Sequence, residues 1–208
     1  MSVMDRETEV LLRLAVAIAL GDEARTAERS REAVAAGIGA LWVDELLLQS
    51  AQVIGYPRTL VGAKVWRETT GIMAPATDPA LAETMAEWHA RGVAHCRLVY
   101  GDQADHLRAN VRALHPALEA GMITGAYGRV LSRPGLDPIH RELCSVAQIA
   151  TMGAATQLYS HLRGALHTGA SDALVEAAIA VIRQDLTADQ AAVLTQVWHT
   201  VREREHTA

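Results

Sequence analysis

Apolar residues recur at helical spacing along most of the chain, and short polar or glycine-containing breaks divide them into segments. The opening run RETEVLLRLAVAIAL has apolar positions three and four residues apart, and Gly21 ends it. The Thr-, Pro- and Gly-rich stretch 69–80 interrupts the pattern and is the best linker candidate. From these patterns we predict helices over residues 6–20, 22–36, 44–55, 58–68, 80–98, 103–120, 121–132, 140–152, 154–169, 171–185 and 187–205.

The order of segments in the first half of the chain returns in the second half. Residues 14–47 read as apolar helix, Gly21, polar helix, Gly37 and amphipathic helix, and residues 144–179 follow the same order. We interpret this as a duplicated unit, although two Ala-rich helical hairpins can look alike without common origin. The interpretation divides the chain into a first repeat (1–70), a linker with connecting helices (71–120) and a second repeat (121–208).

The composition is typical of a helical protein, and the charge disfavours nucleic acid as a partner. Half of the residues are apolar, mostly Ala, Leu and Val, and Phe is absent. Ala and Leu are strong helix formers, so we predict an all-α fold. The net charge is −5 and no stretch concentrates Lys or Arg, which disfavours a nucleic-acid partner.

Several features point to a cytoplasmic protein outside the membrane. The start MSVMDRETEV lacks the basic and apolar regions of a signal peptide, and no apolar run is long enough to span a bilayer. Cys96 and Cys144 form no CxxC and are expected to be ordinary reduced thiols, with Cys144 in the core. Five histidines in polar helices are expected on the surface: His89, His95, His106, His115 and His199.

One pair of side chains could perform acid–base chemistry. Gln157 and His161 lie four residues apart on one face of the predicted helix 154–169, and the preceding helix carries Glu142. A carboxylate bonded to an imidazole fixes its tautomer and tunes its pKa. Taken alone, such a pair is more often structural or solvated. Arg133 and Arg163 could bind a substrate carboxylate, or be a loop anchor and a surface ion pair.

Residues 127–178 resemble carboxymuconolactone decarboxylases. The shared motifs are Gly128-Arg129-Val130, the break Arg133-Pro134-Gly135-Leu136-Asp137, Gln157-Leu158, and the run from His161 to Leu166 that precedes Gly169. Residues 46–63 (LLLQSAQVIGYPRTLVGA) resemble the family more weakly. The resemblance implies a duplicated helical bundle of the alkylhydroperoxidase D-like type, whose members form trimers or hexamers.

In the alkylhydroperoxidase D relatives a Glu and a His form a proton relay that serves a CxxC pair. Glu142 and His161 stand at the matching places, whereas the two cysteines correspond to Ala154 and Gln157. This departure removes disulfide-based peroxide reduction by that route. In the first copy the His161 position falls at Arg29, and Glu9 lies one residue from the Glu142 position, so that copy is degenerate.

The resemblance and the residues together suggest a decarboxylase or lyase without cofactor or metal. It would act on a carboxylated lactone or similar small organic acid, with Glu142 and His161 catalytic and Gln157, Arg133 and Arg163 binding substrate. Three fused chains would form a pseudo-hexameric ring. Two alternatives remain open: an alkylhydroperoxidase-like peroxide-metabolising protein, and a non-catalytic ring-forming helical protein.

Overall fold

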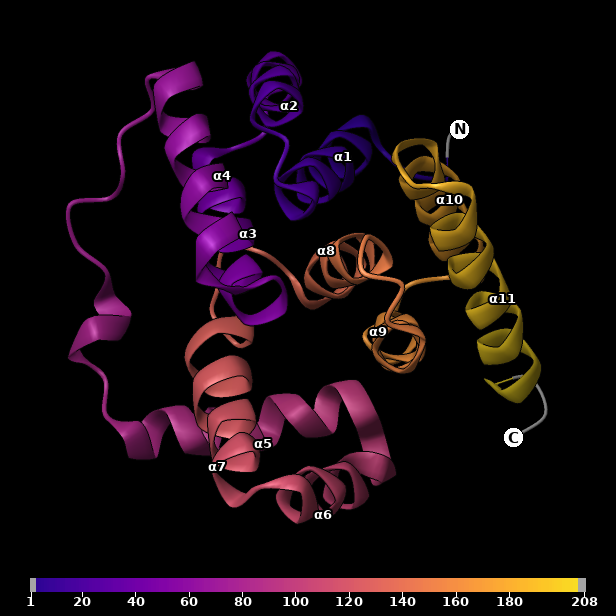
Figure 1. Ribbon diagram of the computed structural model, residues 1–208. Helices are drawn as coiled ribbons and strands as arrows, with labels where there is room; N and C mark the ends of the chain where they lie inside the picture. The colour runs from indigo at the N-terminus through magenta and orange to yellow at the C-terminus, as the bar shows by residue number, and fades with distance from the viewer. Residues whose placement is uncertain (1–2, 206–208) are drawn as a thin grey trace.

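The computed structural model describes residues 3–205, which form helices joined by loops and turns and include no strand (Figure 1). The all-α prediction is therefore confirmed. The elements are α1 (Arg6–Leu20), α2 (Glu23–Ala35), α3 (Ala40–Val53), α4 (Gly55–Thr70), η1 (Pro79–Ala82), α5 (Met85–Tyr100), η2 (Gly101–Gln103), α6 (Ala104–Leu114), α7 (Pro116–Ala120), η3 (Gly121–Leu131), α8 (Pro138–Ala150), α9 (Ala155–His167), α10 (Asp172–Ile182), η4 (Arg183–Asp185) and α11 (Ala188–Glu205).

Local sequence signals set the ends of most helices. Asp5 caps α1 by accepting a hydrogen bond from the Thr8 N–H, and Gly21 ends that helix in the left-handed conformation. Before α11, the Thr187 N–H donates to the Gln190 side chain and the Gln190 N–H donates to Thr187 Oγ1. This reciprocal pair is a capping box, which starts the helix.

Some predicted boundaries were wrong, each for a local reason. Helix α3 begins at Ala40 and not at Asp44, because the extended Gly39 already starts it. The predicted helix 103–120 breaks at His115, which Pro116 holds in an extended conformation. Residues 121–131 are helical as predicted, but they wind as a π-helix, η3.

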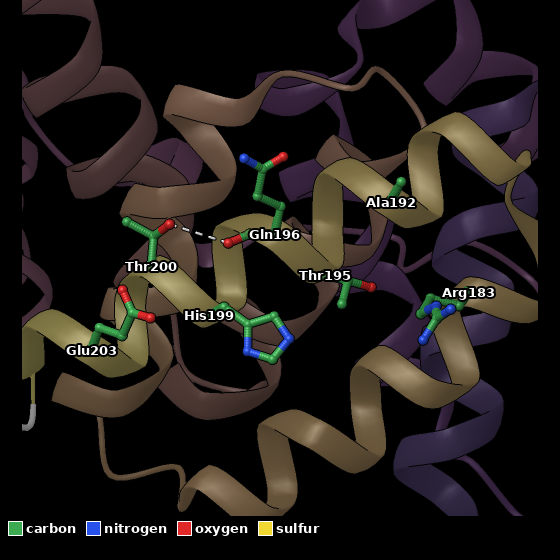
Figure 2. A pocket seen from close by; sticks show the side chains of 7 residues that line it. All are labelled: Arg183, Ala192, Thr195, Gln196, His199, Thr200 and Glu203. Atoms are coloured by element: carbon green, nitrogen blue, oxygen red, sulfur yellow. Dashed lines mark hydrogen bonds between the residues drawn. The ribbon is translucent and has the colours of Figure 1, made fainter.

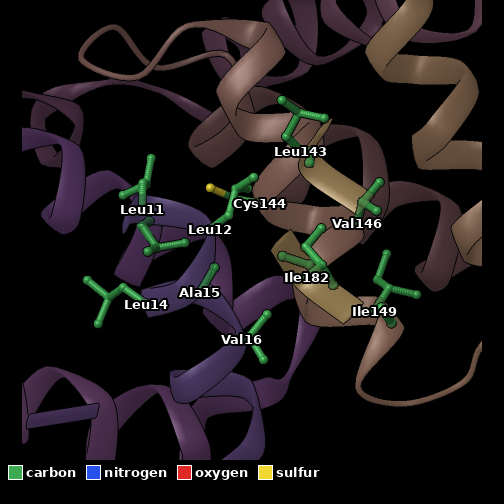
Figure 3. Packing of buried hydrophobic residues seen from close by; sticks show 14 of the residues in the cluster. Leu11, Leu12, Leu14, Ala15, Val16, Leu143, Cys144, Val146, Ile149 and Ile182 are labelled. Atoms are coloured by element: carbon green, nitrogen blue, oxygen red, sulfur yellow. The ribbon is translucent and has the colours of Figure 1, made fainter. Parts of the chain in front are cut away.

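One hydrophobic core joins the first and second halves of the chain. Helix α8 lies at the centre of Figure 1 and packs against α1, α3, α9, α10 and α11. Leu11 and Leu14 of α1, Leu143 and Val146 of α8 and Ile182 of α10 belong to the same buried cluster (Figure 3). The two halves therefore share a single interior.

The middle of the chain forms a second, smaller layer. A separate cluster of buried side chains comes from α5, α6 and η3: Cys96, Val99, Ala104, Ile123, Tyr127 and Leu131. The backbones of α5 and η3 are in direct contact here. A Cβ atom on Gly92 would lie 1.9 Å from the carbonyl oxygen of Ile123, and a Cβ atom on Gly128 would lie 1.8 Å from the carbonyl oxygen of Trp88. Only glycine permits this approach. The layer packs against α9 through α5, at the lower part of Figure 1.

Several helix pairs of the first half have a counterpart in the second half, although the packing of α3 on α4 is not matched between α10 and α11. Helix α1 packs on α2 and α10 as α8 packs on α9 and α3. Helix α2 packs on α4 as α9 packs on α11, and α1 also packs directly on α8. Thr8 Oγ1 and His140 Nε2 lie 2.8 Å apart. These two residues are 132 positions apart in the sequence, as are Gly21 and Gly153. The duplication stays a prediction that this pattern supports, and the termini of its two units, residues 1–2 and 206–208, lie outside the described residues.

Candidate functional site

Helix α8 carries Glu142 into the interior. The helix starts at an Asp137 cap followed by Pro138, and Glu142 stands one turn inside it. Glu142 is only 1% exposed, and its neighbours Leu143 and Cys144 are core residues. A carboxylate so deeply buried needs a specific partner to offset its lost hydration.

His161 of α9 is that partner. Its Nδ1 lies 2.8 Å from Glu142 Oε2, and its side chain is 15% exposed. The tautomer with its hydrogen on Nδ1 is the one that can donate to a carboxylate oxygen at this distance. Nε2 is then the nitrogen left to exchange a proton with a ligand. The structure thus brings together the two side chains that the sequence analysis paired.

Gly164 allows this contact, because it leaves room for the carboxylate against α9. A Cβ on Gly164 would lie 2.5 Å from Glu142 Oε2 and 2.8 Å from Val99 Cγ1 of α5. Helix α5 is also tied to α9 by a hydrogen bond of 2.8 Å between His167 Nδ1 and the Val99 carbonyl oxygen. The buried carboxylate therefore lies between α8, α9 and α5.

Helices α5 and η3 carry two tyrosines and a second histidine whose pKa values respond to the Glu142 charge. The Tyr127 hydroxyl donates to the Tyr100 hydroxyl across 3.0 Å, and the rings of His95 and Tyr127 are 6.1 Å apart. Burial, reinforced by the Glu142 charge and opposed by the Tyr127 hydrogen bond, raises the pKa of Tyr100 to about 12. Burial raises the pKa of Tyr127 well above its ordinary value. Both phenols are therefore neutral at physiological pH.

The surface prediction for His95 was wrong. His95 is partly buried, whereas His89, His106, His115 and His199 are exposed as expected. Burial lowers the pKa of His95; the Arg141 charge acts in the same direction and the Glu142 charge opposes it. One signal was present in the sequence: His95 and Val99 lie four residues apart and share a face of α5. Nothing in the sequence shows what that face covers.

A cavity of about 390 Å³ opens between His95 and the loop that leads into α8. Its other walls come from residues 131–138, among them Ser132, Arg133 and Asp137. Glu142 and His161 are not among the described residues that line it. His95 is the residue that lines the cavity and also interacts with the Glu142 charge.

Arg133 and Arg141 anchor this loop through carboxylates. Arg133 Nε lies 3.0 Å from Glu45 Oε1, and its Nη1 lies 3.0 Å from Asp78 Oδ1. Arg141 donates to the other oxygen of Glu45 across 2.7 Å, and Arg141 and Glu45 are both 1% exposed. Two guanidinium groups thus face two carboxylates, and the network is neutral as a whole.

The other two predicted substrate-binding residues lie on α9. Gln157 is exposed on its first turns, one turn before His161. Arg163 Nε donates to Glu205 of α11, and its guanidinium lies 6.0 Å from the centre of the Tyr159 ring. The structure therefore places Arg163 in a contact between α9 and α11.

Both cysteines are buried free thiols. Burial raises the pKa of Cys96 to about 11 and that of Cys144 to about 12. Since the thiolate is the nucleophile in thiol chemistry, neither residue is primed for it at neutral pH. The core position predicted for Cys144 matches its location in α8.

A second cavity, of about 540 Å³, lies away from this site (Figure 2). Thr195, His199 and Glu203 of α11 line it, with Arg183 of η4 on the opposite side. Thr200 donates a hydrogen bond to the Gln196 carbonyl oxygen on the same helix. None of the lining residues belongs to α8 or α9.

The equivalent place in the first half holds an ion-pair cluster. At a separation of 132 residues, His161 corresponds to Arg29 and Glu142 to Val10. Arg29 lies 2.8 Å from Glu32 Oε1 and 3.8 Å from Asp185 Oδ1. No buried carboxylate–imidazole pair can form at these two positions.

Comparison with known proteins agrees with the motifs of the second half. Residues 116–199 match the model of the carboxymuconolactone decarboxylase family, a region that contains α8, α9 and the Glu142–His161 contact. The chain is 28% identical over 130 residues to Peroxisomal protein 2 of Schizosaccharomyces pombe. That alignment covers 61% of this chain and 60% of the relative's length. Residues 116–199 are therefore similar to the carboxymuconolactone decarboxylase family.

Proposed function

We propose that the protein is a decarboxylase or related lyase that acts on a carboxylated lactone or similar small organic acid, with no organic cofactor or metal. The observation that carries the proposal is the 2.8 Å contact between His161 Nδ1 and the buried Glu142 carboxylate. A positioned imidazole contributes about 10²–10⁴ in rate as a general acid or base. The match of residues 116–199 to the family model supports the helical fold on which this proposal rests.

The reaction needs one positioned proton donor from the protein. In a lactone with a conjugated ring carbonyl, the bond to the carboxylate carbon breaks and carbon dioxide leaves. The electron pair moves through the ring to the carbonyl oxygen and forms a dienolate. His161, protonated on Nε2, then returns a proton to the ring carbon next to the carbonyl, while Glu142 stabilises the imidazolium through Nδ1.

Carbon dioxide release tests this proposal. Two lactones are offered: 4-carboxymuconolactone, with two carboxylates, and 5-oxo-2,5-dihydrofuran-2-carboxylate, which has the same ring and only the departing carboxylate. We expect release from at least one, and its loss in His161→Ala. No release from either lactone, or undiminished release in the variant, would contradict the proposal.

Peroxide metabolism is the less favoured reading, because Ala154 and Gln157 stand where the relatives have thiols and both cysteines have raised pKa values. Thiol-dependent peroxide consumption that disappears in a Cys96→Ser/Cys144→Ser double variant would reverse this preference. A non-catalytic protein would show neither carbon dioxide release nor peroxide consumption.

We further propose that three chains assemble into a ring around these sites. Helices α3 and α4 leave large apolar side chains exposed, among them Leu41, Tyr56 and Leu60, which an interface would cover. A monomeric mass in light scattering would contradict the trimer.

The location that we propose is the cytoplasm, whose reducing conditions suit two free thiols. No helix among residues 3–205 is both long and apolar enough to cross a bilayer. The fission-yeast relative is peroxisomal by name, so imaging of a tagged chain would decide between the two compartments.

A further inference from the structure

The loop between η3 and α8 and the side chain of His95 on α5 enclose a cavity of about 390 Å³. This volume falls in the range of about 300–1,000 Å³ that is typical of small-molecule sites. Four apolar side chains line the cavity: Leu131, Pro134, Leu136 and Pro138. A ligand could therefore place a small ring against an apolar surface.

Contacts within the protein fix the backbone of this loop. Arg141 donates from Nε to the Leu136 carbonyl oxygen and from Nη2 to the Arg133 carbonyl oxygen, both across 3.0 Å. Gly135 adopts a positive φ of 106°, and a Cβ on it would lie 3.0 Å from Leu41 Cγ of α3. The wall is thus formed before a ligand binds, which lowers the ordering cost of binding.

Each charged side chain that lines the cavity already has a partner in the protein. Asp137 Oδ1 accepts a hydrogen bond of 3.1 Å from the His140 N–H, and Asp137 Oδ2 contacts Nδ1 of the same histidine. Arg133 is bound to Glu45 through Nε and to Asp78 through Nη1, each at 3.0 Å. A ligand carboxylate or ammonium would therefore lose its hydration without a free opposite charge to receive it.

The groups left for a ligand are hydrogen-bond donors and acceptors. Within residues 3–205, the His95 ring contacts the Tyr127 ring and makes no hydrogen bond. Burial lowers the pKa of His95, so at neutral pH its ring offers one donor and one acceptor. Ser132 Oγ donates to the Gly128 carbonyl oxygen and can still accept, and Arg133 Nη2 donates to none of the described residues. Carbonyl and hydroxyl oxygens of an uncharged ligand match these groups.

We propose that this cavity is a second binding site, which takes a small uncharged ring compound with carbonyl and hydroxyl oxygens. His95 and Ser132 bind the hydroxyl group, Arg133 donates to the carbonyl oxygen, and the leucines and prolines cover the ring. The cavity is separate from the Glu142–His161 contact, so this site does not depend on the decarboxylase function proposed above.

The test uses two ligands with the same ring. One is 5-(hydroxymethyl)-2(5H)-furanone, which is uncharged, and the other is 5-oxo-2,5-dihydrofuran-2-carboxylate, in which a carboxylate replaces the hydroxymethyl group. NMR titrations follow the His95 imidazole and the Gly135 amide at the cavity, and the His161 imidazole at the pair. We expect the uncharged lactone to move the His95 and Gly135 signals and leave the His161 signal unchanged. Measured at the cavity signals, it should bind at least about tenfold more tightly than the carboxylate.

One variant and a matched control test the role of the imidazole. His95→Leu keeps an apolar side chain at the cavity and removes its hydrogen bonds, so affinity for the uncharged lactone should fall about three- to tenfold at the Gly135 signal. His89→Leu changes an exposed histidine of the same helix and should leave the affinity unchanged.

Three results would overturn the proposal. They are a carboxylate that binds the cavity as tightly as the uncharged lactone, a His95 signal that does not respond to the uncharged lactone, and an unchanged affinity in His95→Leu. Thermal denaturation identifies a folding defect in the variant, and the wild-type comparison of the two ligands needs no variant. Carbon dioxide release from the carboxylate tests the decarboxylase function alone, so the two proposals fail separately.

Discussion

The two halves of the chain use the same helical order for different purposes. Asp5 and Asp137 cap the equivalent helices α1 and α8, and Gly21 and Gly153, which follow those helices, both have positive φ. In the second half the interior receives Glu142, whereas the first half has Val10 at the equivalent position. The helical order is similar in the two halves, and the buried carboxylate–imidazole contact lies in the second.

The surroundings of the equivalent helices explain the difference. Helix α9 is packed by α5 and α11, and Val99 of α5 lies close to the buried Glu142 carboxylate above Gly164. Helix α2 is packed by α4, and its Arg29 belongs to an ion-pair cluster with Glu32 and Asp185. The half that carries the Glu142–His161 contact is thus also the half on which α5 packs.

The largest effect should follow from removing the pair. We expect Glu142→Gln and His161→Ala to lower carbon dioxide release about 10²–10⁴-fold, because the proton donor or its orienting anion is lost. Arg29→Ala, the equivalent change in the first half, should alter the rate by less than about twofold. Initial rates of carbon dioxide release by the three purified variants measure this difference. An equal loss of rate in Arg29→Ala would contradict a site confined to the second half.

The next effect concerns the buried ion pair between α3 and α8. Arg141→Met leaves Glu45 with only the partly exposed Arg133, and breaking such a pair costs about 3–5 kcal/mol in the free energy of unfolding. At a separation of 132 residues, Arg141 corresponds to Glu9 in the first half, which forms a salt bridge with Arg13 near the surface. Glu9→Gln should cost about 0.2–1 kcal/mol. Urea unfolding of both variants measures the difference, and similar costs would contradict it.

A smaller effect is expected at Gly164. Gly164→Ala would place a methyl group 2.5 Å from the Glu142 carboxylate, so α5 or Glu142 must shift, at a cost of about 1–3 kcal/mol. Gly125→Ala is the control, because a Cβ there meets nothing within 4 Å. Thermal midpoints and the His161 NMR signal should change in Gly164→Ala only.

The contact between the two halves at Thr8 and His140 should contribute less. Thr8→Val removes one hydrogen bond of 2.8 Å and keeps the side-chain shape, with an expected loss of about 0.5–1.5 kcal/mol. Chemical denaturation measures it, with Thr200→Val as the control, because its bond lies within one helix near the surface. A cost at Thr200 as large as that at Thr8 would argue against a special role of the contact.

The smallest effect is a pH dependence from His95. Its folded-state pKa lies below the unfolded value of about 6.5, so the unfolded chain takes up the proton first as pH falls. The contribution to stability is present above pH 6.5 and decreases as pH falls through the folded-state pKa. Thermal midpoints from pH 8 to 5 should decline less in His95→Gln than in the wild type. Parallel curves would contradict a buried, neutral His95.

The sequence alone determined what depends on neighbours a few residues apart. The helical spacing, the caps at Asp5, Ser171 and Thr187, and the breaks at Gly21 and Gly153 are local properties. The family motifs also placed Glu142 and His161 on successive helices, nineteen residues apart. Within a helical hairpin this spacing permits contact, and the structure has it at 2.8 Å.

Only the tertiary structure decided which groups surround that pair and which charges remain available. His95 and Tyr100 come near this part of the molecule because α5 packs on α9 after a linker, and no periodicity in the sequence encodes that packing. Arg133 and Arg163 were candidate carboxylate ligands by type, and the fold gives both of them carboxylate partners in the chain itself. A long-range contact depends on how distant helices pack, which residue type and local spacing do not specify.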